Sequence, residues 1–134
     1  YRSRWLIEEY FKALKTGCAY EKRQLESRHA LMNALAVFAP CAWRLMLLRT
    51  LSRHDDQRPA SDVLGATQLQ ILEALPRTRL PMNSTVKDAM YAIAKLGGHL
   101  KRNGPPGWLT LGRGFDKLLS IELGWIAAKI YDQS

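Results

Sequence analysis

Four residues near the start of the chain have the side-chain types of a site that handles phosphate. Tyr1, Arg4, Glu8 and Lys15 supply a phenol, two cations and a carboxylate. Each residue of an α-helix turns by about 100°, so these side chains project at about 0, 300, 340 and 320°. The spacing therefore predicts that all four lie along one narrow stripe.

This mixture of charges suits a site that binds a divalent metal ion and a phosphate together. A carboxylate such as Glu8 is a metal ligand, and cations such as Arg4 and Lys15 pair with phosphate oxygens. The alternative is a solvated helix face on which Glu8 pairs with Arg4 at i,i+4, which contributes about a few tenths of a kcal/mol. On spacing alone the alternative is favoured.

The apolar residues of the same segment predict which way the stripe faces. They cover the arc from about 140 to 280° on the same count, and they are Leu6, Ile7, Tyr10, Phe11 and Leu14. We therefore expect this face to be buried, with the polar stripe beside it on the wall of a cleft.

The spacing Tyr-x2-Arg-x3-Glu-x6-Lys resembles the YREK motif of the insertion-sequence DDE transposases. The surrounding segment YRSRWLIEEYFKALKTG is similar to the same family, as are YAIAKLGG at residues 91–98 and the segment 108–129. These segments look like the C-terminal region of the transposase group that moves composite antibiotic-resistance transposons by a cut-and-paste route.

The resemblance implies a part of a metal-dependent enzyme that cuts and joins DNA. Glu8 would be the third carboxylate of the DDE triad, sharing two Mg²⁺ or Mn²⁺ ions with two aspartates that lie earlier in the full protein. Tyr1, Arg4 and Lys15 would hold the terminal phosphates and the distorted end nucleotides of the transposon. The metal ions would activate water, and then the DNA 3′-hydroxyl, for in-line attack on phosphodiesters.

We expect the chain to be a piece of a longer polypeptide. It begins at Tyr1 without an initiator methionine, and its first residues already look like the middle of a helix. Asp55, Asp56 and Asp62 follow Glu8, so they are in the wrong order to replace the missing aspartates. The isolated chain is therefore expected to have no strand-transfer activity and to hold no metal by itself.

Helix signals predict an all-α chain. Apolar spacing and capping residues indicate helices over residues 1–15, 20–51, 67–75, 86–96 and 114–131, and no segment alternates as a strand does. Pro40 is expected to kink or break the second helix, and Thr85 with Asp88 to cap the fourth.

A polar segment divides the chain in two. Residues 52–61 lack apolar periodicity and are typical of an exposed linker. With the resemblance, this division assigns residues 1–52 to the last helices of a ribonuclease-H-like catalytic domain. Residues 53–134 become a helical C-terminal dimerisation domain.

The last helix and the loop before it are further candidates for binding. The resemblance implies that this helix pairs with a second subunit, through Leu118, Leu119, Gly124, Trp125, Ile126 and Ala128. The same apolar surface could equally pack inside one subunit. Lys101 and Arg102 could contact a DNA backbone, although a solvated turn is the commoner role. This loop, with Pro105 and Pro106, is shorter and stiffer than in the family.

Composition favours an anionic partner. Lysine and arginine total 20 against 12 aspartate and glutamate, which gives a net charge of +8 and favours DNA, although a soluble domain can simply be basic. The two cysteines and three histidines have no disulfide or metal-ligand spacing, so a reducing cytoplasm is expected. No apolar segment is long enough to span a membrane, and no small-molecule substrate is indicated.

Three functions therefore remain in competition. The first is a transposase fragment whose catalysis is completed by an upstream part. The second is a basic helical module that binds nucleic acid without chemistry, and the third is a self-association domain that ignores DNA. The upstream reading frame and DNA binding separate these three hypotheses.

Overall fold

The computed structural model describes residues 2–13, 16, 28–55, 57–100 and 104–133, apart from the side chains of residues 2–6, 28–31, 33–35, 37–38 and 133. The elements in chain order are α1 (Arg2–Lys12), α2 (Arg28–His54), the 3-10 helix η3 (Ala60–Asp62), α3 (Ala66–Ala74), α4 (Val86–Leu96) and α5 (Trp108–Gln133). Within these ranges the fold is all-α, as predicted, and strand-like pairing is confined to one isolated bridge between Pro59 and Thr85.

The ends of α4 follow from local sequence, as predicted. The Thr85 hydroxyl accepts a hydrogen bond from the Asp88 amide at 3.2 Å, and the Asp88 carboxylate accepts one from the Thr85 amide at 3.1 Å. This reciprocal pair satisfies two amides that a helix start leaves without partners. After Gly97, Gly98 takes a φ of 91°, which glycine adopts without strain and which ends the helix.

Helix α2 continues through Pro40 and past its predicted end. Pro40 lies inside the helix, so the predicted alternative of a break there is wrong. The helix also runs to His54, so Ser52 is buried rather than part of an exposed linker. The Ser52 hydroxyl lies 2.8 Å from the Arg49 carbonyl and 3.2 Å from the Met90 sulfur, which fixes this last turn against α4.

The core surrounds α4, which packs against both α2 and α5. The largest fully buried side chains of the core come from α2, α3, α4 and α5, and include Leu45, Leu48, Ile71, Leu72, Ile93, Leu111 and Leu118. Residues on both sides of the predicted boundary at 52/53 thus share one core. The division into two domains stays a prediction.

Helix α5 approaches the end of α4 closely because Gly114 of α5 and Gly97, just after α4, lie at the contact. A Cβ atom built on Gly114 meets the backbone carbonyl of Ile93, and one on Gly97 meets the carbonyl of Thr110. The helix starts at Trp108, so the predicted start near residue 114 is wrong. Trp108 and Leu111 are buried, and their packing stabilises the first turn of α5. The sequence did not predict this turn, because the segment just before it is rich in glycine and proline.

A buried glutamine connects three helices. The Gln68 side chain on α3 accepts a hydrogen bond from Arg44 on α2 at 3.2 Å. Its amide donates to Glu122 on α5 at 2.9 Å. Because Gln68 is almost fully buried, these bonds satisfy polar atoms that would otherwise be costly to bury.

Helix α1 packs against α2 with a face that overlaps the predicted one only in part. Glu9 and Ala13 are buried, whereas Ile7 and Phe11 are 55% and 58% exposed, so the expectation that the apolar arc is covered is wrong for these two residues. The reason is that α1 packs on a single helix, which covers only one edge of it. The Tyr10 hydroxyl donates to the Ala39 carbonyl at 3.3 Å and fixes that edge.

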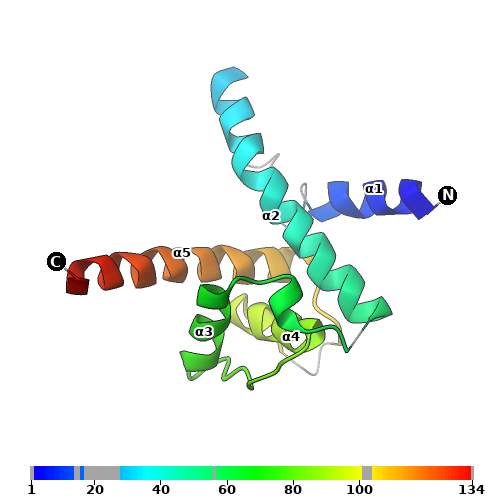
Figure 1. Ribbon diagram of the computed structural model, residues 1–134. Coiled ribbons are helices and arrows are strands. Elements are labelled where there is room, and N and C mark those ends of the chain that lie inside the picture. Colours follow the sequence, from blue (N-terminus) through cyan, green and yellow to red (C-terminus); the bar gives the residue numbers. More distant parts are fainter. Residues whose placement is uncertain (1, 14–15, 17–27, 56, 101–103, 134) are drawn as a thin grey trace.

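Figure 1 shows that α1, the first part of α2 and the last part of α5 extend away from the packed centre. No helix in the described part of the chain combines the length and the apolarity needed to cross a bilayer.

Candidate nucleic-acid interface

Glu8 is the motif residue whose own side chain the structure describes. It lies on α1 with an exposed side chain, next to the buried Glu9. Glu9 forms an ion pair with Lys12 at 3.5 Å. The two adjacent glutamates therefore differ: Glu9 packs against the protein, and Glu8 can be reached from solvent.

The other three motif residues cannot be placed around Glu8. Tyr1, Lys15 and the side chain of Arg4 lie outside the described residues. The backbone of Arg4 belongs to α1, one turn before Glu8, which is the relation that the predicted stripe requires of this pair. Whether all four side chains form one stripe stays a prediction.

An apolar groove adjoins α1 and was not foreseen from the sequence. Ile7, Tyr10, Trp43 and Met46 line an open cavity of about 310 Å³ between α1 and α2. The Tyr10 and Trp43 ring centroids are 6.5 Å apart, and Trp43 is half exposed. Exposed apolar side chains such as Trp43 mark a surface that another protein segment could cover.

No group of three or more acidic, histidine or cysteine side chains in the described part of the chain could hold a metal ion. A magnesium ion takes six ligands, and a single carboxylate such as Glu8 supplies only one or two of them. Glu8 therefore fits one ligand position and leaves the others to groups outside the described residues.

A group of cations lies elsewhere, between α2 and α4. Arg49, Arg53 and Lys87 line an open cavity of about 280 Å³, whose other lining residues are Ser52, Met90, Tyr91, Pro105 and Pro106. None of these lining residues is acidic. The cavity is therefore a place where positive charge collects without a carboxylate in its wall.

Arg49 is fixed within this group. Its guanidinium carbon lies 4.5 Å from the centroid of the Trp108 ring, a cation–π arrangement that ties α2 to the start of α5. Burial lowers the pKa of Arg49, the neighbouring Arg53 lowers it further, and the negative charge of Glu9 opposes both effects. Arg49 nevertheless stays protonated at neutral pH, because the ordinary pKa of arginine is so high.

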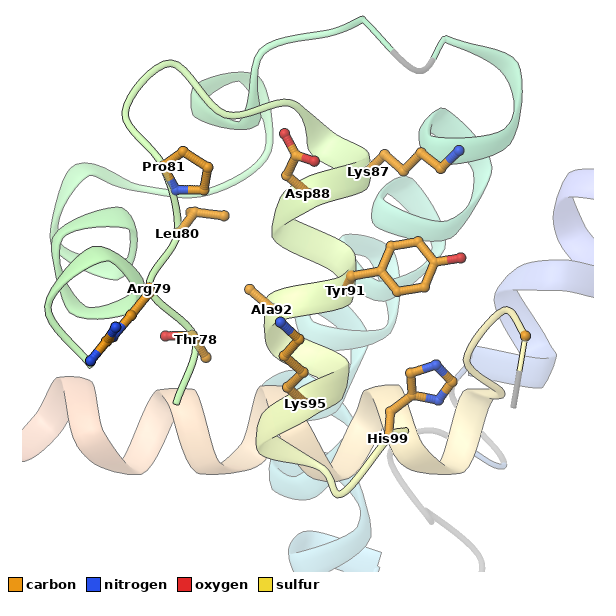
Figure 2. A pocket seen from close by; sticks show the side chains of 11 residues that line it. Thr78, Arg79, Leu80, Pro81, Lys87, Asp88, Tyr91, Ala92, Lys95 and His99 are labelled. Carbon is orange, nitrogen blue, oxygen red and sulfur yellow. The ribbon is translucent and has the colours of Figure 1, made fainter. Parts of the chain in front are cut away.

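A second cavity of about 550 Å³ adjoins the first and shares Lys87 and Tyr91 with it. Figure 2 shows Lys87 and Tyr91 projecting from the same side of α4, with His99 below Tyr91, and the segment 78–81 running alongside the helix. Arg79 and Lys95 add two more cations to the lining of this second cavity. Asp88 is the one acidic lining residue, and its carboxylate already caps α4.

The predicted basic loop ends at these cavities. Lys101 and Arg102 lie outside the described residues. Gly104, just after them, borders the larger cavity, and Pro105 and Pro106 border the smaller one. A role for Lys101 and Arg102 in binding DNA stays a prediction.

The six residues predicted for self-association occupy different environments on α5. Leu118 is fully buried within this chain, and Leu119 and Trp125 are partly buried against the core. Gly124, Ile126 and Ala128 are exposed. The most exposed apolar residues near this end of the helix are others, namely Leu123, Ile130 and Tyr131.

No protein-family model matches the sequence.

Proposed function

We propose that this chain is the C-terminal part of a cut-and-paste DNA transposase, and that it acts in the bacterial cytoplasm on the ends of a mobile element. In this proposal it supplies the third metal-binding carboxylate of the parent enzyme, contacts to the DNA end, and a surface for self-association. Its partners are transposon-end DNA, target DNA and a second subunit, with no membrane and no small-molecule substrate.

The observation that carries the proposal is the spacing of Tyr1, Arg4, Glu8 and Lys15, together with the resemblance of residues 1–17 to the YREK segment of insertion-sequence transposases. Two structural facts support it. Residues 2–12 are helical, as the stripe requires for Arg4 and Glu8, and Glu8 is exposed while its neighbour Glu9 is buried. A carboxylate that must reach a metal ion and DNA needs this accessibility.

Magnesium or manganese is the cofactor that the proposal requires. Glu8 would hold it from this chain, and two aspartates of the rest of the enzyme would complete the ligand set. When bound, the ions would activate water and then the DNA 3′-hydroxyl and stabilise the charge that develops at the phosphate. Tyr1, Arg4 and Lys15 would position the terminal phosphates, since arginine binds phosphate in a bidentate way and lysine acts as a point charge.

The exposed apolar groove fits a chain that is only part of a domain. Ile7, Phe11 and Trp43 are each more than half exposed on α1 and α2. In the proposal, α1 and α2 are the last helices of a ribonuclease-H-like catalytic domain, and the preceding polypeptide covers this face. Covering these side chains would bury apolar surface that water now contacts.

The exposed end of α5 supports self-association. Leu119, Leu123, Ile126 and Ile130 follow at intervals of four, three and four residues, the pattern of an a/d seam between two helices. Leu123 and Ile130 are 72% and 62% exposed. Because Leu118 is buried in its own subunit, the proposed contact with a second copy uses this exposed stripe rather than Leu118.

The test is the substitution Glu8→Gln in the complete parent polypeptide. We expect normal binding to a duplex that carries the transposon end and a loss of cleavage of at least about a hundredfold, since a lost metal ligand removes several kcal/mol of transition-state stabilisation. Glu73→Gln on α3 is the matched control, because it removes one exposed carboxylate far from the motif in sequence, and it should leave cleavage unchanged. Normal cleavage by the Glu8→Gln enzyme would refute the catalytic assignment.

A nucleic-acid-binding module without chemistry is the second candidate, and the cations between α2 and α4 favour it. A stop codon immediately before Tyr1 in the upstream frame would favour this second candidate. The transposase proposal predicts that the frame continues into a strand-rich region with two aspartates. A chain that self-associates but ignores DNA in sedimentation would support the third function instead.

A further inference from the structure

Three residues form a line along the outer side of α4. Lys87, Tyr91 and Lys95 follow each other at intervals of four, and all three border the larger cavity. Four residues of α-helix advance about 6 Å and turn the chain by slightly more than a full circle, so the three side chains share one side and span about 12 Å. Figure 2 shows Lys87 and Lys95 on this helix with Tyr91 between them.

Cations from the flanking elements border the same space. Arg53 reaches the smaller cavity from α2, and Arg79 reaches the larger one from the loop after α3. Within the part of the chain that the structure describes, neither these two arginines nor Lys87 and Lys95 form an ion pair. We call these four cations, with Tyr91, the α4 basic groove.

Lys95 and Arg53 lie in the last turns of α4 and α2, where the helix dipole favours a cation, but other charges of this surface are opposed. Lys87 lies in the first turn of α4, where the positive end of the helix dipole repels a cation. Arg49 and Arg53 stand four residues apart on α2, a spacing at which like charges repel. An anion bound between α2 and α4 would relieve these two repulsions.

Two ring side chains add further contacts to this surface. The Tyr91 and His99 ring centroids are 6.0 Å apart, and both residues border the larger cavity. The His99 Nε2 atom is buried and has no hydrogen-bond partner among the described residues. Buried polar atoms normally have a partner, so this nitrogen is a candidate to bond a group outside the described residues.

We propose that the α4 basic groove binds the sugar-phosphate backbone of DNA, at a site separate from the motif on α1. A DNA strand has one phosphate per 3.4 Å of helix axis, so the span from Lys87 to Lys95 faces about three or four phosphates. The backbone contacts fix where the duplex lies and do not read its sequence. This inference rests on the proposed function, which makes DNA the partner.

The experiment measures the affinity of the 134-residue chain for a short duplex at several salt concentrations. The double variant Lys87→Gln and Lys95→Gln removes two groove cations, and both side chains are exposed, so the fold should persist. The matched control, Arg113→Gln and Lys117→Gln, removes two exposed cations of α5 that border neither cavity. Fluorescence anisotropy gives the dissociation constant, and circular dichroism checks the fold of each variant.

We expect the groove variant to lose affinity and its log–log salt slope to fall by about 1.8, since each phosphate contact contributes about 0.9. The control variant should keep most of the slope, although its net charge equals that of the groove variant. Equal slopes for the two variants would overturn the groove while leaving DNA binding intact. Failure of the unsubstituted chain to bind any duplex at low salt would instead remove the proposed DNA partner, and the groove with it.

Discussion

Cys41 shows how burial on α2 changes the chemistry of a single side chain. Its thiol is half-buried, and this burial raises the pKa above the ordinary value of 9.0. Arg44 lowers the pKa and Asp116 raises it, both less strongly than burial acts. Because the thiolate is the reactive form of cysteine, the folded chain should protect Cys41 from alkylation.

The prediction concerns a Cys18→Ser variant, in which Cys41 is the remaining cysteine. We expect iodoacetamide to modify the folded protein more slowly at pH 8 than the same protein unfolded in guanidinium, with the difference read by mass spectrometry. As the pH rises, the thiol ionises at a lower pH in the unfolded chain than in the folded chain. The contribution of this group to the free energy of unfolding is therefore present below pH 9 and is lost as the pH rises through the folded pKa. Equal rates at pH 8 would show that the thiol is not protected.

Among the residues of the candidate sites, some could be identified from the sequence and others could not. Glu8 could be singled out because its motif partners fall within one predicted helix, where spacing determines direction. Lys87 and Lys95 are also visible at a helical spacing, eight residues apart. Their association with Arg53 and Arg79 depends on how α2 and the loop after α3 pack on α4, and no local pattern encodes that.

The contact between α4 and α5 depends on two glycines at the point of closest approach. A methyl group on Gly114 would overlap the backbone carbonyl of Ile93, which cannot move aside as a flexible side chain can. We expect Gly114→Ala to destabilise the fold by about 1–3 kcal/mol, the usual cost of overpacking, in a urea or thermal unfolding experiment.

Gly124→Ala is the control on the same helix, because nothing lies within 4 Å of a Cβ atom at Gly124. Replacing an exposed helical glycine with alanine should be neutral or stabilise by about 0.5–1 kcal/mol. Unfolding of the Gly114→Ala variant at the wild-type midpoint would mean that the two helices can separate at little cost.

The elements that could be predicted are those whose ends are determined locally. Thr85 and Asp88 mark the start of α4 by bonding each other's amides, so its beginning was read correctly. The start of α5 was placed too late, since Trp108 is held there by contacts with Arg49 from a distant segment. The buried face of α1 was misjudged at Ile7 and Phe11 for a related reason: periodicity assumes a partner on the apolar face, and here α2 covers an edge.

For the whole molecule, the proposed self-association has two faces of α5 to choose between. At about 100° per residue, the six residues predicted from the sequence spread over an arc of about 220°, which is wider than the face that one helix presents to a single partner. Ala128 projects about 140° away from Leu123 on the same count. The exposed stripe 119–123–126–130 and the small-residue face with Gly124 and Ala128 are therefore two distinct candidate surfaces.

Two substitutions that each add one negative charge separate these surfaces. If the stripe pairs two subunits, Leu123→Glu buries a carboxylate against an apolar partner and should shift the chain toward monomer in sedimentation velocity, with a weakening of about 2 kcal/mol or more. Ala128→Glu should then leave the dimer intact, because its side chain stays in water. The reverse result would assign the contact to the small-residue face. A chain that is monomeric without either substitution, at every concentration measured, would show that α5 alone does not hold two subunits together and that covering its stripe requires the rest of the parent protein.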